Sequence, residues 1–283
     1  MLGSNLNDIE DIKSEIIVKD YIPLHKGNYN ILAGTGGVGK SQIALKILAH
    51  FLQSNKNERA VCIFTEDTKK VIIERLDMIT RFMNITTAEI IERTFFKTLD
   101  NHDGQVFCSK INKQNLLNEN YFKSFVFNAK ERNVGMVILD PLEAFHTGLA
   151  ENDAEDMKFL TVDIFQKLGV ETGASVLVLH HTNKGDKAGA RGSGVITNKG
   201  RVAYNVMKLY EHDKELGVDV IKSGWEDSVL LSTIKDNHYV SQWCDCIENK
   251  NGKLKMPILD KGINPTQVTE YVSDDNSFLG DII

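Results

Sequence analysis

A glycine-rich octapeptide, Gly34-Thr-Gly-Gly-Val-Gly-Lys-Ser41, constrains the fold of this 283-residue chain more than any other segment. It matches the G-x-x-x-x-G-K-[ST] pattern of a phosphate-binding loop, in which glycines let successive backbone N–H groups point at phosphate oxygens. An apolar run at 29–33 precedes the octapeptide, and the periodicity of 40–53 predicts an amphipathic helix after it. This order favours phosphate binding, because the helix N-terminus adds partial positive charge.

The same alternation of apolar runs and helical patterns continues for about 140 residues. Strands without polar alternation, separated by helices, indicate a parallel sheet that is covered on both faces. After residue 200 the segments become shorter, and we expect them to add antiparallel strands at the C-terminal edge of an α/β fold, with an Asn251-Gly252 hairpin turn in the last. Strands are predicted at 29–33, 60–65, 94–99, 105–109, 135–140, 174–181, 201–210, 228–235 and 242–256, and helices at 40–53, 69–83, 121–131 and 153–172.

Composition and length predict one large core. The chain is 42% hydrophobic, which is ordinary for a globular protein, and it shows no internal repeat. We expect an N-terminal arm or short helix at 1–22, an ATPase domain at 23–259 and a polar, acidic C-terminal tail at 260–283. No run of 18 apolar residues occurs, and 1–20 lacks a signal-peptide core, so the expected location is the cytoplasm without membrane contact.

The octapeptide predicts a nucleotide and its metal ion. Lys40 would reach the β- and γ-phosphates of ATP, and the hydroxyl of Ser41 would hold Mg²⁺. Asp140 ends the apolar run 136–139 and is the natural second Mg²⁺ anchor, although a strand-terminal Asp before Pro141 could simply cap a turn. The residues expected to contact the nucleotide are Gly34, Thr35, Gly36, Gly37, Val38, Gly39, Lys40, Ser41 and Gln42.

Hydrolysis also needs a group that activates water. Glu66 and Asp67 close the predicted strand 60–65, where a carboxylate could orient and deprotonate the attacking water. The alternative is capping of the following helix, which suits Asp67 or Thr68 better than Glu66. We therefore predict that Glu66 is the base.

Two histidines end the strand that follows Asp140. His180 and His181 lie at the same expected sheet edge and could sense the γ-phosphate. The competing interpretation is that they are ordinary core histidines with satisfied hydrogen bonds. Two in a row at a catalytic edge favour the functional role.

The segment 182–201 is the basic part of a chain whose formal net charge is −6. It carries five lysines and arginines, one Asp and several glycines, so a local patch rather than bulk charge would contact nucleic acid. Lys184, Lys187 and Arg191 are the predicted contacts with single-stranded DNA. The alternative is a solvated surface loop without a partner.

Six segments together resemble the RecA-like ATPases of the plasmid RepA type, which are small hexameric replicative DNA helicases. The resemblance extends from about Asp20 to Leu259. Its first motif is shared by all phosphate-loop proteins, whereas the order and spacing of the others are more specific. The segments are Gly34 to Ser41, Phe64-Thr-Glu-Asp67, Leu139-Asp-Pro-Leu142, Leu179-His-His181, Ala190-Arg-Gly-Ser193 and Ile234-Lys-Asp-Asn-His-Tyr239.

The resemblance implies a ring, with a hexamer expected, in which Lys235 reaches the nucleotide of the neighbouring subunit. The predicted strand before Lys235 carries no arginine, so Lys235, Arg191 or Arg201 would have to act as the finger, or hydrolysis is weak. A primase or initiator would be a separate protein. Two other interpretations stay open: a RecA- or KaiC-like ATPase of recombination, repair or signalling, and a nucleotide-gated binding module that barely hydrolyses.

Overall fold

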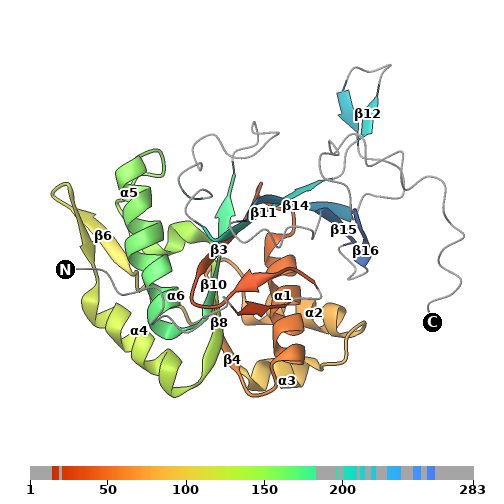
Figure 1. Cartoon of the computed structure of the whole chain (residues 1–283), viewed down its shortest axis with the longest axis horizontal. Helices are drawn as coiled ribbons and strands as arrows, with labels where there is room; N and C mark the ends of the chain where they lie inside the picture. The colour runs from red at the N-terminus through yellow and green to blue at the C-terminus, as the bar shows by residue number, and fades with distance from the viewer. Residues whose placement is uncertain are drawn as a thin grey trace, which may run out of the picture.

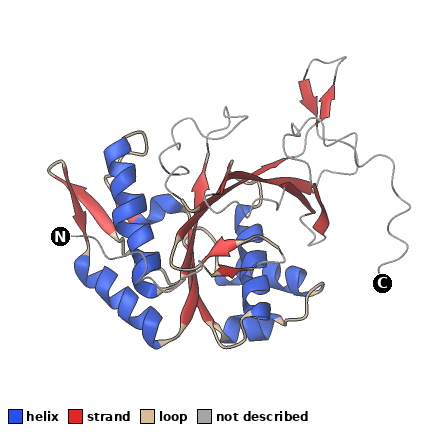
Figure 2. Cartoon of the chain, viewed as in Figure 1, coloured by secondary structure: helices blue, strands red, loops and turns tan. Residues whose placement is uncertain are grey.

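The chain folds around one twisted sheet with helices on both faces, as Figures 1 and 2 show. The computed structural model describes residues 15–18, 21–182, 196, 200–208, 211–213, 218–220, 228–236, 245–249 and 254–258. The central sheet has nine strands in the order β16-β15-β14-β11-β3-β10-β8-β4-β5. Its strands are β3 (Tyr29–Gly34), β4 (Arg59–Phe64), β5 (Thr94–Thr98), β8 (Val134–Asp140), β10 (Ser175–His181), β11 (Val202–Lys208), β14 (Ser228–Asp236), β15 (Asp245–Asn249) and β16 (Leu254–Ile258).

The pairing directions confirm the α/β class with one correction. Strands β11, β3, β10, β8, β4 and β5 run parallel, and β14, β15 and β16 add antiparallel pairs at the C-terminal edge. The expectation that 201–210 is antiparallel holds for one edge only, because Val202–Lys208 pairs antiparallel with β14 but parallel with β3. The long chain between β10 and β11 allows this, since a parallel connection needs a crossover that a hairpin cannot supply.

Two apolar clusters, one on each face, hold the helices against the sheet. Along β8, Met136 and Ile138 belong to one cluster and Val137 and Leu139 to the other, because successive strand residues face opposite ways. The first cluster takes in residues of α1 (Lys40–Ser54), α2 (Lys69–Thr80) and α3 (Thr87–Glu92). The second takes in residues of α4 (Glu119–Glu131), α5 (Ala154–Lys158), the π-helical segment η3 (Phe159–Gln166) and α6 (Lys167–Thr172). Figure 1 shows these two helix groups on either side of the sheet.

Local sequence signals account for the starts of the three helices that cover the first face of the sheet. Helix α1 begins at Lys40 after Gly39, whose φ of 104° is accessible to glycine at little cost. Thr68 caps α2 by accepting a hydrogen bond from the Val71 N–H, and Thr86 forms a capping box with Glu89 at α3. The short helix α3 was not expected from periodicity, although its capping box is readable in the sequence.

The structure also contains smaller sheets beside the central one. Strand β6 (Cys108–Ile111) pairs with β7 (Gln114–Leu117) and with β9 (His146–Thr147), while β12 (Glu211–Asp213) pairs with β13 (Val218–Val220). The predicted strand 105–109 is therefore shifted towards Ile111, and its partner β7 was missed because Asn and Gln interrupt it.

The predicted N-terminal arm needs correction at its C-terminal end. Residues 1–14 lie outside the described residues, as do the Asn251-Gly252 turn and the tail 260–283. Strand β1 (Ile16–Ile17) is extended rather than helical and pairs with β2 (Leu24–His25). Ile17 and Ile22 are buried in the first apolar cluster, so this part of the chain belongs to the core.

The described helices give no sign of a membrane span. None of those within the described ranges combines the length and the apolar character that crossing a bilayer requires.

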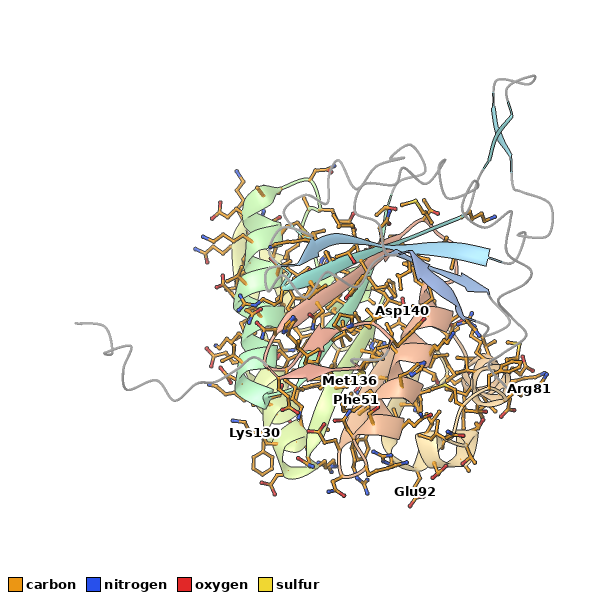
Figure 3. All side chains as sticks on the ribbon, turned by 45° about the vertical axis from the view of Figure 1, so that its right-hand side comes forward. Phe51, Arg81, Glu92, Lys130, Met136 and Asp140 are labelled. Atoms are coloured by element: carbon orange, nitrogen blue, oxygen red, sulfur yellow. The ribbon has the colours of Figure 1, made fainter. Side chains whose placement is uncertain are left out.

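Core packing makes a prediction about two phenylalanines. Phe51 of α1 is fully buried near Met136 of β8, whereas Phe127 of α4 is 64% exposed (Figure 3 labels Phe51 and Met136). Phe51→Ala should lower the free energy of unfolding by about 3–5 kcal/mol, because it removes buried contacts and leaves a cavity. Phe127→Ala is the matched control and should change it by less than about 0.5 kcal/mol. Urea unfolding measures both, and equal losses would contradict this packing.

Candidate functional site

The parallel register brings four strand ends to one edge of the sheet. Gly34 of β3 is paired with His181 of β10, and Asp140 of β8 is paired with Phe64 of β4. Backbone hydrogen bonds continue the alignment beyond the strands, from Thr65 N to the carbonyl of Asp140 at 3.0 Å. Ligands bind outside the carboxyl ends of strands in open α/β sheets, so this edge is the place to look for a site. Figure 3 shows Asp140 at this end of β8.

The glycine-rich loop connects β3 to α1 at this edge. Gly37 and Gly39 have φ values of 73° and 104°, a left-handed backbone that favours glycine. A Cβ at Gly34 would lie 2.6 Å from the carbonyl oxygen of Val206, so the strands permit only glycine there. The loop thus has the curled backbone that points N–H groups at phosphate, directly before the helix N-terminus.

Lys40 occupies the centre of the loop. Its side chain is buried, and its ammonium donates hydrogen bonds to the carbonyls of Gly34 at 2.8 Å and Thr35 at 3.0 Å. The same nitrogen lies 3.1 Å from Nδ1 of His181. Burial lowers the pKa of Lys40, and the carboxylates of Asp140, Glu143 and Glu66 oppose that shift. A buried ammonium that is hydrogen-bonded to neutral loop carbonyls can exchange these bonds for the oxygens of an anion.

Ser41 and Asp140 are joined by a short hydrogen bond. The Ser41 hydroxyl donates to Oδ2 of Asp140 at 2.6 Å, although 98 residues separate them in the chain. Burial raises the pKa of Asp140 to about 6, and the Ser41 hydrogen bond works against this rise. A hydroxyl and a carboxylate are hard oxygen donors, which suits Mg²⁺ held between a protein carboxylate and substrate phosphates. The donor set therefore fits the metal that the loop implies.

Glu66 and Asp67 have different surroundings despite being adjacent. Asp67 forms an ion pair with Arg75 of α2, and its carbonyl accepts from Leu99 N. The Glu66 side chain is 68% exposed, and its Oε2 lies 3.9 Å from Nε2 of His181. Thr68, as noted, caps α2, so Glu66 has no capping role. Of the two acids, Glu66 is the one turned towards Lys40 and His181.

The two histidines lie on opposite faces of β10. His181 lies at the loop, between Lys40 and Glu66. Burial, followed by the Lys40 cation, lowers the pKa of His181, which favours a neutral ring there. His180 faces the other apolar cluster and lies 3.2 Å, Nδ1 to Oε1, from Glu143. The sequence analysis predicted that both histidines lie at the nucleotide site. Because successive strand residues face opposite ways, only His181 lies beside the loop.

Of the remaining predicted residues, Gln42 lies in the first turn of α1 beside the loop, Lys235 lies away from it, and three others are not described. In the register of the sheet, Lys235 of β14 is paired with Ala203 of β11, and Ala203 is paired with Ile31 of β3. The Lys235 ammonium donates a hydrogen bond to the Gly200 carbonyl at 3.0 Å. It therefore lies before the level of Gly34, away from the loop of its own chain. Gln42 has a buried Nε2 without a hydrogen-bond partner among the described residues. Lys184, Lys187 and Arg191 fall in 183–195, outside the described residues.

Sequence reasoning missed two acids beside the site. Glu143 lies in the 3-10 helix η2 (Leu142–Phe145) and Glu151 in the turn before α5, and both lie close to His180. The sequence contained only a weak indication of these residues, namely acids in the segment that follows the strand-terminal Asp140. The closeness of Glu143 and Glu151 to His180 depends on how that segment folds back towards β10.

Comparison with known proteins identifies a family whose model matches this chain. A family model described as an AAA domain (AAA_25) matches residues 13–187. The matched region contains the glycine-rich loop, Glu66, Asp140 and both histidines. No curated protein matches the chain.

The raised pKa of Asp140 makes a prediction about stability without nucleotide or metal. The pKa of Asp140 is about 6 in the folded chain and about 3.9 in the unfolded chain. The protonated carboxyl therefore contributes to the free energy of unfolding at low pH, and this contribution is lost as the pH rises through 6. Asp140→Asn removes this titration, so its stability relative to wild type should rise by roughly 1 kcal/mol between pH 5 and pH 8. Urea unfolding with a chelator present measures it. A difference that does not vary with pH would refute the shift.

Proposed function

The chain belongs to the AAA domain family, and from that premise we propose that it is an ATP-driven motor that assembles into a ring and acts as a replicative helicase on single-stranded DNA. Family membership makes it a phosphate-loop ATPase. The proposal covers four points: ATP as the nucleotide, a ring that is expected to be a hexamer, single-stranded DNA as the substrate, and the residue roles given below.

The observation that carries the proposal is the convergence of Lys40, Ser41 and Asp140 from two elements on one point. Lys40 would exchange its bonds to loop carbonyls for contacts with the β- and γ-phosphates. Ser41 and Asp140 would hold Mg²⁺, which when bound neutralises charge on those phosphates. The hydrogen bond that now joins them preorganises both donors, so little rearrangement is needed.

Glu66 would accept the proton of the water that attacks the γ-phosphate. Its exposure leaves room for water, and no pairing with Arg75 restrains it, in contrast to Asp67. His181 lies between Lys40 and Glu66, so its ring could respond when phosphate displaces the lysine contact. A neutral ring has one donor and one acceptor nitrogen, so Nδ1 can accept from the Lys40 ammonium while the Nε2–H faces Glu66.

Strand β10 connects this sensor to the basic loop. His181 is the last residue of β10, and the segment 182–201 begins directly after it. A change at His181 on hydrolysis would therefore act on the start of the loop that carries Lys184, Lys187 and Arg191. Movement of these cations with each cycle would pull on the phosphates of single-stranded DNA.

A ring would complete the site with a cation from a neighbour. Because Lys235 lies away from the loop of its own chain, its role as a finger would require the adjacent subunit. Arg191 and Arg201 are the other candidates. A primase or initiator would act as a separate partner.

A second candidate function rests on the composition of β14. This strand carries no arginine, and without a finger hydrolysis would be slow. The chain would then be a nucleotide-gated binding module, or a RecA- or KaiC-like ATPase of recombination, repair or signalling. ATP-fuelled strand separation in the presence of Mg²⁺ distinguishes the helicase from these alternatives.

The carboxylate assignment makes the first functional prediction. Glu66→Gln keeps size and polarity but cannot accept a proton, so ATP turnover should fall by about 10²-fold or more while ATP binding persists. Asp67→Asn is the matched control and should keep most of the turnover. Lys40→Ala should abolish turnover and weaken binding, because the phosphates lose their cation. Steady-state phosphate release and nucleotide titration measure these effects.

Either of two results would reject these assignments. Full turnover by Lys40→Ala would remove the phosphate-loop mechanism. A larger loss in Asp67→Asn than in Glu66→Gln would move the base to Asp67.

The DNA assignment makes the second functional prediction. Single-stranded DNA should stimulate ATP turnover, and the stimulation should weaken as salt rises, because each neutralised phosphate contributes roughly −0.7 to the slope of log affinity against log salt. Joint replacement of Lys184, Lys187 and Arg191 by alanine should remove stimulation. The matched control replaces the exposed Lys56, Lys130 and Arg132, which changes the net charge equally.

The outcomes of this comparison separate the hypotheses. Equal loss in both triple variants would indicate a bulk charge effect. Loss of basal turnover in the loop variant would favour Arg191 as the finger. No response to DNA in the wild type would favour the signalling interpretation.

A further inference from the structure

A second polar cluster lies on the face of β10 opposite the phosphate loop. It consists of Glu143 from η2, Glu151 from the turn before α5 and His180 from β10. One possible ligand atom from each residue lies within 4.8 Å of the other two. The Glu143 carboxylate also acts electrostatically on Lys40 and His181, but the three residues that form this cluster are distinct from Lys40, Ser41 and Asp140.

His180 is the best-buried member of the cluster. Its side chain is 2% exposed, and Nδ1 lies 3.2 Å from Oε1 of Glu143 without hydrogen-bond geometry. Among the described residues, His180 Nδ1 and Glu143 Oε2 are both buried atoms with no hydrogen-bond partner. Buried polar atoms are usually paired, because leaving one unpaired costs about 1–3 kcal/mol. Both atoms belong to residues of this cluster, so a ligand bound there would pair them.

The charges of the cluster point to a cation. Glu143 and Glu151 bring two carboxylates next to the imidazole of His180, and the possible ligand atoms of the three residues lie within 4.8 Å of one another. Two neighbouring carboxylates repel each other unless a proton or a cation lies between them.

We infer that Glu143, Glu151 and His180 bind one divalent transition-metal ion, such as Mn²⁺ or Zn²⁺. An imidazole with two carboxylates is a donor set for these ions, whereas Mg²⁺ and Ca²⁺ prefer oxygen alone. Two ligands about 2.1 Å from a tetrahedral ion lie roughly 3.4 Å apart, close to the 3.2 Å between His180 and Glu143. Glu151 is partly exposed and has the side-chain freedom to close the remaining gap.

The ion would hold together three segments that meet only through folding. It would tie η2, which follows the Asp140 strand, and the turn before α5 to the strand that ends in His181. It would thereby restrain the position of His181 from the opposite face of β10. This site does not depend on the proposed function, because its ligands are present without nucleotide.

The test measures Mn²⁺ binding to the full, chelator-treated chain without nucleotide, by electron paramagnetic resonance. We expect a bound ion whose pulsed spectrum shows coupling to an imidazole nitrogen. Glu151→Gln should weaken binding at least tenfold, because one of three protein ligands is lost. The matched control is Glu155→Gln, an exposed acid in the first turn of α5, and it should bind as wild type does.

Further variants separate this site from the nucleotide site. Asp140→Asn should retain the ion, because Asp140 is not one of the three ligands. If Glu151→Gln fails to fold by circular dichroism, Glu143→Gln replaces it with the same expected loss. Absence of bound Mn²⁺ in the wild type, binding unchanged by both glutamate variants, or binding lost in Asp140→Asn would each overturn the inference. None of these results bears on ATP turnover, which is measured separately.

Discussion

The hydrogen bond between Ser41 and Asp140 can form only in a sheet with this strand order. The candidate site in turn depends on this hydrogen bond, which brings the two side chains together. It joins the start of α1 to the end of β8 at 2.6 Å. Strand β10 lies between β3 and β8, so the bond spans the position of an intervening strand. It can form only because the carboxyl ends of these parallel strands align at one edge. Burial of Asp140 raises its pKa to about 6, so the charged form of this carboxylate is costly to keep at this position.

Strand β10 separates two kinds of chemistry by simple alternation. His181 faces α1 and meets Lys40, while His180 faces the second cluster and meets Glu143. Because adjacent residues on a strand point to opposite sides, one short sequence serves both faces. Strand β10 pairs with β3 on one edge and with β8 on the other, so it lies inside the sheet.

Several site residues could be predicted because they are encoded locally. The loop glycines, Lys40 and Ser41 follow from a contiguous motif, and Asp140 follows from the end of an apolar run. The sequence could not show the ion pair between Asp67 and Arg75, which is the structural difference between Asp67 and its neighbour Glu66. The antiparallel pairing of β11 with β14 was predicted but its parallel pairing with β3 was not, because short strands after a long connection resemble hairpin strands in sequence.

By itself, the sequence determined the phosphate loop, the α/β alternation and the acids that end strands, because each depends on residues close together in the chain. Only the tertiary structure decided which strands are neighbours, which face each histidine occupies and which acids meet. Glu143, Glu151 and His180 come from three separate segments, and no local pattern specifies their distance. The physical reason is that side-chain periodicity is local, whereas register and sheet order come from packing two apolar faces at once.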